Sequence, residues 1–378
     1  MRFEFAAPAR ILFGEGTLRE VAPAAAAMGK RALVVTGKSA ERARPVIASL
    51  EAAALECVPF AVPGEPSIEL IREGAEFARD ERCELVIAIG GGSAIDAGKA
   101  LAAMLTNTGG PLDYLEVIGK GQPLAHPSAP FIAIPTTAGT GSEVTRNAVL
   151  ASSEHRVKAS LRSAFLLPRL AVVDPELTLD LPRSVTAYTG LDALTQLIEP
   201  YVSRRANPMA DLFCVEGMRT AATALPRVRD NPHDREARSG MSWAALLGGL
   251  ALANAALGAV HGFAAPVGGM FPAPHGAIIA AILPHAMEVN IRALRGDTGR
   301  YTQVARLLTG RPQATAEDGV AWVRELCRKL EIPPLREYGV SQADVPALVE
   351  KAGHTSSMKG NPVTLGREEL TEILGAAI

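Results

Sequence analysis

The chain has 378 residues, of which 48% are hydrophobic and 21% are charged, a composition typical of a globular protein long enough to form two domains. Its 38 lysines and arginines nearly balance its 40 aspartates and glutamates, so no basic surface for nucleic acid is expected. The four cysteines are scattered without a C-x-x-C pair, which argues against a disulfide framework or a cysteine zinc site and favours a reducing cytoplasm.

The first half of the sequence alternates short aliphatic runs with amphipathic stretches. In chain order, the aliphatic runs predict strands at residues 31–37, 56–60, 84–90, 131–137 and 170–175. The amphipathic stretches predict a helix that ends near residue 54, and helices at residues 67–80 and 93–107. Because the strand candidates are apolar throughout rather than alternating, we expect a parallel sheet that is covered by helices.

Beyond residue 183 the pattern changes to alanine- and leucine-rich helical stretches without a convincing strand. We therefore expect an α/β nucleotide-binding domain at 1–183 and an all-helical domain at 184–378.

Residues 241–258 are apolar over about the length that a bilayer requires. They are rich in alanine and glycine and contain Asn254, which favours a buried helix over a membrane span. The N-terminus has an early acid and no long apolar run, so no signal peptide is expected.

Two glycine-containing loops follow predicted strands. In IGGGSAIDAGKA, at 89–100, the backbone N–H groups of Gly91 and Gly92 would be open to a phosphate, and Ser93 could cap the next helix. The motif is neither G-x-G-x-x-G nor a P-loop, so a tight turn without a ligand is the alternative. The second loop, IPTTAGTGSEVT at 134–145, offers hydroxyl groups to a nucleotide, namely those of Thr136, Thr137, Thr140 and Ser142.

The turn after the first predicted strand bears on the choice of dinucleotide. An acidic residue near this strand end usually binds the ribose 2′-hydroxyl of NAD. Here the turn consists of Gly37, Lys38 and Ser39, with Arg42 one helical turn further on. The missing carboxylate and the nearby cations favour a 2′-phosphate, and we therefore expect NAD(P) binding that leans to NADP.

Four further residues raise the question of a metal site. The predicted helix GLDALTQLIEPYVS, at 190–203, places Asp192 and Gln196 four residues apart and therefore on one face. His261 and His275 occur in VHGFAAPVGGMFPAPHG, whose prolines and glycines prevent one continuous helix, so the two imidazoles should come from different elements. Two histidines and a carboxylate form a recurrent metal site, but packed core histidines and a polar helix stripe would explain the same residues.

Several long motifs resemble those of the iron-containing (group III) alcohol dehydrogenase family, and the likeness covers nearly the whole chain. The motifs are GGGSAIDAGKA, IPTTAGTGSEVT, DPELTLDLP, TGLDALTQLIEPYVS, HGFAAPVGGMFPAPHGAIIAAILPH and SSMKGNPVTL. The resemblance implies a parallel α/β nucleotide-binding domain and an all-helical domain that contains the metal and substrate sites.

The resemblance also implies roles for individual residues. It implies metal ligands at Asp192, His261 and His275, with Gln196 in the place where the family usually has a histidine. Ala265 replaces a histidine that is thought to relay protons in relatives. As cofactor contacts it implies the glycine loop with Gly91, Gly92 and Ser93, together with Thr136 and Thr137. The reading of the turn and loops above adds further candidate cofactor contacts, namely Gly37, Lys38, Ser39, Thr140 and Ser142. Asp96, a further candidate cofactor contact, and Lys99 match the family as well, although their side-chain roles are less clear.

The expected function is that of an NAD(P)-dependent oxidoreductase that interconverts a small alcohol and its aldehyde or ketone, hydroxy acids and their semialdehydes included. It would use a divalent metal (Fe, Zn or Mn), held weakly because the Gln196 amide is a poorer ligand than imidazole. Small molecules are the expected substrates, with no nucleic-acid or membrane partner. A homodimer, by analogy with relatives, and a cytoplasmic location are also expected.

Three alternatives remain open at this point. A maleylacetate-reductase-like enzyme would have a metal-free site in which Gln196, with a cation such as Lys158, contacts the substrate. A dehydroquinate-synthase-like lyase would share the architecture without net turnover of the dinucleotide. A nucleotide-binding protein without activity would have lost its site at Gln196 and Ala265, although Asp192, His261 and His275 argue against such decay.

Overall fold

The computed structural model describes residues 2–38 and 40–378. The chain divides into two compact units, which we call the α/β unit and the helical unit. The α/β unit is formed by Ala6–Thr137 and Gly141–Leu179. The helical unit is formed by Asp180–Ile378 together with the short segments Met1–Phe5 and Ala138–Thr140.

The α/β unit is built on a six-stranded sheet in the order β1-β8-β5-β4-β2-β3, in which all neighbouring strands are parallel. Its strands are β1 (Ile11–Phe13), β2 (Arg31–Thr36), β3 (Glu56–Ala61), β4 (Leu85–Gly90), β5 (Phe131–Pro135) and β8 (Leu170–Val173). Its helices are α1 (Val21–Ala26), α2 (Arg44–Ala52), α3 (Ile68–Asp80), α4 (Gly92–Thr106) and α5 (Pro111–Tyr114). The predicted parallel α/β architecture is therefore confirmed.

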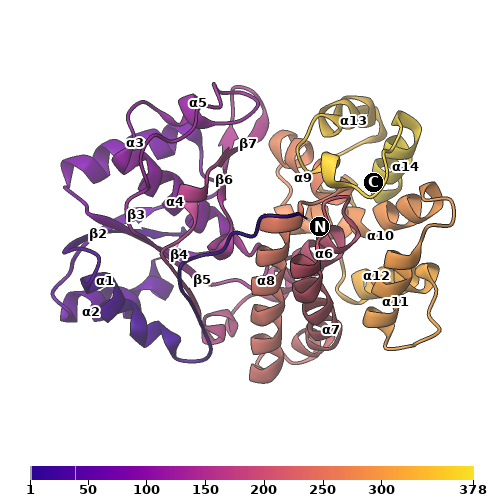
Figure 1. Cartoon of the computed structure of the whole chain (residues 1–378), viewed down its shortest axis with the longest axis horizontal. Helices are drawn as coiled ribbons and strands as arrows, with labels where there is room; N and C mark the ends of the chain where they lie inside the picture. The colour runs from indigo at the N-terminus through magenta and orange to yellow at the C-terminus, as the bar shows by residue number, and fades with distance from the viewer. Residues whose placement is uncertain (1, 39) are drawn as a thin grey trace. The chain divides into compact units, whose positions relative to one another are not determined.

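Successive residues of the central strands enter two different hydrophobic clusters, because side chains alternate between the faces of a strand. Leu33 and Val35 of β2 pack in a cluster with residues of α3 and α4, whereas Ala32 and Val34 pack in a second cluster with residues of α1 and α2. Figure 1 shows these two helix pairs on opposite sides of the sheet. Burial on both faces explains why the strands are apolar throughout.

An antiparallel hairpin in the α/β unit is absent from the elements expected above. It consists of β6 (Asn147–Ser152) and β7 (Val157–Arg162), which pair with each other and form a separate two-stranded sheet. Ala148 and Leu150 of β6 are buried in the same cluster as residues of α3 and α4, while Val149 between them is half-buried. The hairpin thus packs one apolar face against helices α3 and α4.

The helical unit follows and contains the remaining α-helices, whose colours run from rose through orange to yellow in Figure 1. They are α6 (Arg183–Val202), α7 (Pro208–Asp230), α8 (Arg235–Ala255), α9 (Ala259–Met270), α10 (His275–Ala293), α11 (Gly299–Thr309), α12 (Ala316–Lys329), α13 (Val345–Gly353) and α14 (Arg367–Ala377). Their apolar faces meet in one hydrophobic core. The expected all-helical character of this part of the chain is confirmed.

The apolar stretch at residues 241–258 falls mainly in α8. Its residues Ala244, Leu247 and Ala251 are buried in the core of the helical unit, which is the arrangement predicted for a buried helix. In the described part of the chain, no helix by itself combines the length and the apolar character needed to cross a membrane, although α8 and α9 do so as a pair bent by 98°.

Candidate functional site

Asp192 and Gln196 lie one turn apart in α6, and both side chains are buried. Glycines on and around this helix allow its neighbours to pack closely. A Cβ atom at Gly190 would lie 2.4 Å from Leu225 of α7, and one at Gly248 of α8 would lie 3.3 Å from the Cβ of Gln196. The two polar side chains are therefore fixed in the interior of the helical unit rather than exposed as a surface stripe.

His261 and His275 lie on two different helices, as predicted. His261 is the third residue of α9, and His275 is the first residue of α10. At Gly276 a Cβ atom would lie 2.5 Å from the backbone oxygen of Tyr188, so the start of α10 packs directly on α6. Because Asp192 follows Tyr188 by one helical turn, this contact places His275 beside Asp192.

The side chains of Asp192, His261 and His275 converge. Asp192 Oδ1 lies 3.4 Å from His261 Nε2 and 3.8 Å from His275 Nε2. The centroids of the two imidazole rings are 5.7 Å apart, and the rings are inclined by 53°. One potential ligand atom of each residue lies within 4.8 Å of those of the other two, which is close enough for all three to bind one metal ion.

The cluster also contains lone pairs that no protein group uses. Asp192 Oδ1, Gln196 Oε1 and His261 Nε2 are buried and have no hydrogen-bond partner among the described residues. An unpaired buried polar group costs about 1–3 kcal/mol, and native proteins contain few of them. A carboxylate oxygen, an amide oxygen and two imidazole nitrogens are ligands that divalent cations accept. The residues present therefore fit a metal ion.

The charges of the cluster agree with this assignment. Burial opposes the ionisation of Asp192, but His261, His275 and the Gln196 amide together lower the pKa of its carboxyl group below the usual value. Burial likewise opposes protonation of His261, yet the carboxylates of Glu199 and Asp192 raise the pKa of its imidazole to about 9. The site thus attracts a cation, and a metal ion would compete with a proton for His261.

A carboxylate that sequence reasoning missed lies directly behind His261. Glu199 is buried on α6, seven residues after Asp192, and its Oε2 lies 2.6 Å from His261 Nδ1. Residues seven apart lie on the same face of a helix, so the spacing of Asp192 and Glu199 could have identified it. Glu199 thereby contacts the ring nitrogen opposite the one that faces Asp192.

The glycine loop lies where β4 passes into α4. Gly91 is the N-cap of α4 and Gly92 its first residue, so the prediction that Ser93 caps this helix was wrong: Ser93 lies inside the first turn. Within residues 2–38 and 40–378, no side chain caps the helix. The first backbone N–H groups of a helix have no partner within the helix, and together with the helix dipole they favour a phosphate at this position.

The other predicted nucleotide loops of the α/β unit meet the glycine loop at one edge of the sheet. Thr136 donates its backbone N–H to the Gly90 oxygen, at 2.9 Å. A Cβ atom at Gly91 would lie 3.6 Å from a side-chain carbon of Thr137, and one at Gly90 would lie 3.5 Å from the backbone nitrogen of Gly37. The carboxyl ends of β2, β4 and β5 therefore bring these loops together, which is where ligands of parallel sheets bind.

Asp96 and Lys99 of α4 join the loop that contains Ser142. Lys99 is completely buried, and its ammonium group donates hydrogen bonds to Ser142 Oγ, Thr145 Oγ1 and the Asn147 oxygen at 2.8, 2.7 and 2.8 Å. Asp96 accepts hydrogen bonds from Ser142 Oγ and from the backbone of Val149. These bonds give the two side chains a structural role that the sequence did not reveal.

The remaining predicted residues are more dispersed. Lys38 is exposed just after β2, and Ser39 lies outside the described residues. Thr140 lies in the short segment that belongs to the helical unit, and Ala265 lies on α9 one turn after His261. Lys158 of β7 forms an ion pair with Glu65 at 3.1 Å, so that a side chain of the α/β unit already neutralises its charge.

The comparisons with known proteins match both units. Residues 8–175 match the family model described as iron-containing alcohol dehydrogenase, and residues 186–378 match the C-terminal model of the Fe-containing alcohol dehydrogenase family. The choline dehydrogenase of Bacillus subtilis is 35% identical, over 96% of this chain and 92% of its own. The NAD-dependent methanol dehydrogenase of Bacillus methanolicus is 32% identical, over 99% of both chains.

A solved structure of 1,3-propanediol oxidoreductase has 32% sequence identity and superposes with a TM-score of 0.94, covering 100% of both chains. The family matches span both units, and relatives above 30% identity are covered over nearly their whole length. This chain therefore belongs to the iron-containing alcohol dehydrogenase family and is an enzyme of the alcohol dehydrogenase type.

Proposed function

We propose that this enzyme interconverts a small alcohol and its aldehyde at a divalent metal ion held by Asp192, Gln196, His261 and His275. The main support is that Asp192, Gln196 and His261 each present a buried atom that no group in the described part of the chain hydrogen-bonds, with the His275 imidazole beside them. When bound, the metal supplies Lewis-acid polarisation of the substrate oxygen, which assists hydride exchange with the nicotinamide cofactor.

The ligand residues determine how tightly the ion is held. Asp192 supplies the negative charge of the ligand set. The Gln196 side-chain oxygen is uncharged and is a harder ligand than an imidazole nitrogen. We infer a lower metal affinity than a histidine at position 196 would give, and a shift of preference from Fe²⁺ towards Zn²⁺ or Mn²⁺.

Proton transfer differs from that of relatives with a histidine at position 265. Ala265 lies four residues after His261 on α9, and its methyl group cannot accept or donate a proton. We infer that the proton of the substrate hydroxyl leaves through water or through a second hydroxyl group of the substrate.

The names of the relatives support a substrate class. Choline, methanol and 1,3-propanediol, which appear in the names of these relatives, are all small primary alcohols. We propose a small primary alcohol for this chain too, hydroxy acids included.

For the cofactor, the uncapped start of α4 beside Thr137 and Gly37 supports binding of the dinucleotide phosphates at this edge of the sheet. Gly37 provides no carboxylate for a ribose 2′-hydroxyl, and Lys38 is exposed next to it. These two features support the proposed lean to NADP.

The deciding experiment compares metal content and activity in one preparation. Protein purified without chelator is analysed for metals, and then assayed with short aldehydes and with NADH or NADPH before and after chelation. We expect about one ion per chain, loss of activity on chelation and recovery with Zn²⁺ or Mn²⁺. Full activity without metal would overturn the metal assignment and favour the maleylacetate-reductase-like alternative.

A matched pair of variants sharpens the test. Asp192→Asn should remove the bound metal and the activity, because it removes the only carboxylate of the proposed ligand set. Asp211→Asn changes a carboxylate of α7 that pairs with Arg300 and should retain both. Equal metal content in the two variants would exclude Asp192 as a ligand.

A further inference from the structure

His261 lies in the first turn of α9, and this turn is held by side chains from elsewhere. Gly258, at the N-cap of α9, offers no side chain to the free N–H groups of the helix. Glu199 of α6 supplies one of the missing acceptors. Its Oε1 accepts the backbone N–H of Val260 at 2.8 Å, while its Oε2 lies 2.6 Å from His261 Nδ1. One buried carboxylate thus contacts both the backbone and the imidazole of this turn.

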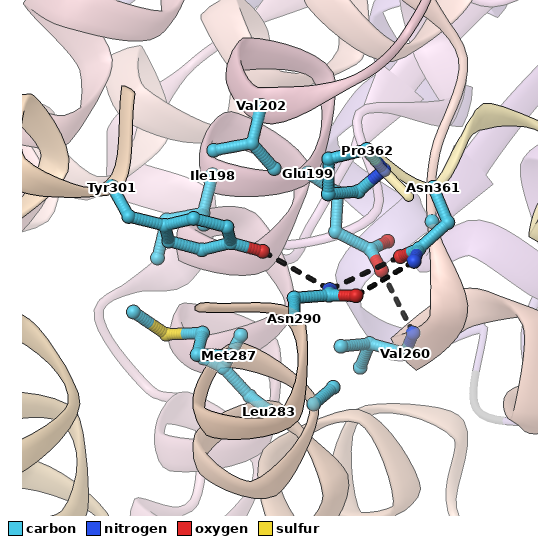
Figure 2. Close-up of a pocket in the computed structure, with 12 residues that line it drawn as sticks. Ile198, Glu199, Val202, Val260, Leu283, Met287, Asn290, Tyr301, Asn361 and Pro362 are labelled. Carbon is cyan, nitrogen blue, oxygen red and sulfur yellow. Dashed lines mark hydrogen bonds between the residues drawn. The ribbon is translucent and has the colours of Figure 1, made fainter. Parts of the chain in front are cut away.

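Asn361 supplies the second acceptor. Its Oδ1 accepts the backbone N–H of Ala259 at 3.1 Å, across 102 residues of sequence. Asn361 and Asn290 of α10 exchange two amide hydrogen bonds, at 2.7 and 3.1 Å, and Asn290 also donates to the Tyr301 hydroxyl at 3.0 Å. Figure 2 shows these groups side by side at one end of α9. We call Glu199, Asn290, Tyr301 and Asn361 the anchor network.

The anchor network lines a small cavity whose other walls are largely apolar. Its walls include Ile198, Val202, Leu283 and Met287. Gly258 is packed tightly between the two acceptors, because a Cβ atom there would lie 2.9 Å from Glu199 Oε1 and 3.0 Å from Asn361 Oδ1. In such a poorly solvated environment hydrogen bonds are strong, and a missing partner is costly.

We propose that Glu199 is a positioning residue for the metal ligand His261 and that the rest of the anchor network supports it. This inference rests on the proposed metal site. The carboxylate accepts the Nδ1–H of His261, which fixes the tautomer and leaves the Nε2 lone pair free on the side of Asp192. At the same time it fixes the backbone from which the imidazole projects. The negative charge also suits its position at a helix N-terminus.

The identity of residue 199 is critical, because both of its partners donate hydrogen bonds. A carboxylate accepts from the Val260 N–H and from the His261 Nδ1–H at once, whereas an amide has one acceptor and one donor end. Glu199→Gln must therefore leave the Val260 N–H unpaired or convert Nδ1 into an acceptor. In the second case the proton moves to Nε2, which can no longer bind the ion.

The test measures the affinity of the protein for Co²⁺, which can replace Zn²⁺ and whose complexes absorb visible light. Metal-depleted protein is titrated with Co²⁺ in competition with a chelator. We expect Glu199→Gln to lower the affinity roughly 10- to 100-fold and to alter the absorption of the bound Co²⁺. Dinucleotide affinity and melting of the metal-depleted protein serve as controls. Asn361→Ala, which keeps the Glu199 contact, should give a smaller loss of Co²⁺ affinity than Glu199→Gln.

Thr195→Val is the matched control. Thr195 is equally buried on α6, and its hydroxyl donates a hydrogen bond to the Leu191 oxygen of the same helix. We expect Co²⁺ affinity within about twofold of the wild type. An equal affinity in Glu199→Gln and Thr195→Val would overturn the positioning role while leaving the metal site intact. Failure of the wild type to bind Co²⁺ would overturn the metal site itself, and the positioning role with it.

If Glu199→Gln does not fold, Asn361→Ala alone decides the question. A loss of Co²⁺ affinity relative to Thr195→Val would support the anchor network. Unchanged affinity and spectrum would overturn it.

Discussion

Lys99 Nζ lies 2.8 Å from Ser142 Oγ, and this hydrogen bond joins the helix after the glycine loop to the loop after β5. The two other hydrogen bonds of the ammonium group go to Thr145 and Asn147, so each of its three donors has an acceptor. Asp96 lies 3.6 Å from the same ammonium group. Ser142 therefore holds the loop in place through its side chain, and a direct contact with the cofactor remains a prediction.

Replacing Lys99 by methionine should destabilise the α/β unit. The change would leave the Asp96 carboxylate without its cation and three acceptors without a donor. Breaking a buried ion pair in this way typically costs about 3–5 kcal/mol. We expect a lower melting temperature and weaker dinucleotide binding, measured by thermal unfolding and by titration with NADPH. Lys120→Met, at an exposed lysine paired with Asp113, should change neither. A Lys99→Met protein with wild-type melting would contradict this account.

Glu143 predicts a pH dependence of stability. Burial raises the pKa of its carboxyl group from 4.5 to about 7. Between these values the folded chain binds more protons than the unfolded chain, so stability falls as the pH rises from about 4.5 to 7 and levels off above that. Glu143→Gln cannot ionise, and its melting temperature should therefore exceed that of the wild type at pH 8 but not at pH 4.5.

Thermal unfolding at a series of pH values would test this expectation. Glu73→Gln, at an exposed carboxylate of the same unit, serves as the control and should keep the wild-type difference between pH 5 and pH 8. If the melting temperatures of Glu143→Gln and the wild type changed in parallel with pH, Glu143 would already be ionised at low pH in the folded chain.

Gln196→His should tighten metal binding. The substitution replaces a neutral amide oxygen by an imidazole nitrogen at the same position of α6, and it completes the ligand set that the family usually has. A group that hydrogen-bonds to a metal ligand typically contributes roughly tenfold to the metal affinity, and replacing a ligand itself should raise the affinity at least that much. Competition between the protein and a chelator for Zn²⁺ would measure it, with Gln196→Ala as the variant expected to bind more weakly. Unchanged affinity in both variants would favour a substrate-contacting role for Gln196.

Gly37→Asp should shift cofactor preference towards NAD. Apart from its neighbours in the chain, no atom of the described residues lies within 4 Å of a Cβ atom built at Gly37, so a side chain fits there. The new carboxylate would repel a 2′-phosphate and offer a hydrogen-bond acceptor to a 2′-hydroxyl. The ratio of kcat/KM for NADPH to that for NADH should fall at least roughly tenfold, since like charges cost several kcal/mol. Gly37→Ala should leave the ratio unchanged, and an equal ratio in all three proteins would disprove 2′-phosphate binding at this turn.

The sequence predicted the sheet well because its strands are buried on both faces. Continuous runs such as LVIAIG have few other stable arrangements, and the glycines and prolines around them limit their ends. Strand β1 has only three residues, too few to show a pattern. The hairpin β6–β7 does alternate buried and half-buried residues, but serine, alanine and charged residues make this alternation weak.

The sequence predicted only those residues of the site whose chemical type itself indicates a metal site. Asp192, His261 and His275 are recognisable because carboxylates and imidazoles bind metals and because of the family resemblance. Asn290 and Asn361, which lie 71 residues apart, are common residues whose meaning depends on a contact made only in the folded chain. The role of Lys99 was hidden for the same reason, since most single lysines lie on the surface.

Because the start of α9 depends on a contact with Asn361, a chain can contain all the proposed metal ligands without holding them in place for binding. A fragment that ended between His275 and Asn361 would contain all four residues proposed to bind the ion, yet the start of α9 would lack one of its two acceptors. The contacts of this turn span 61 to 102 residues, and such distant contacts form late, because a long loop must close first. During refolding, metal uptake should therefore lag behind the formation of the helices, and ions added early should bind no faster than ions added late.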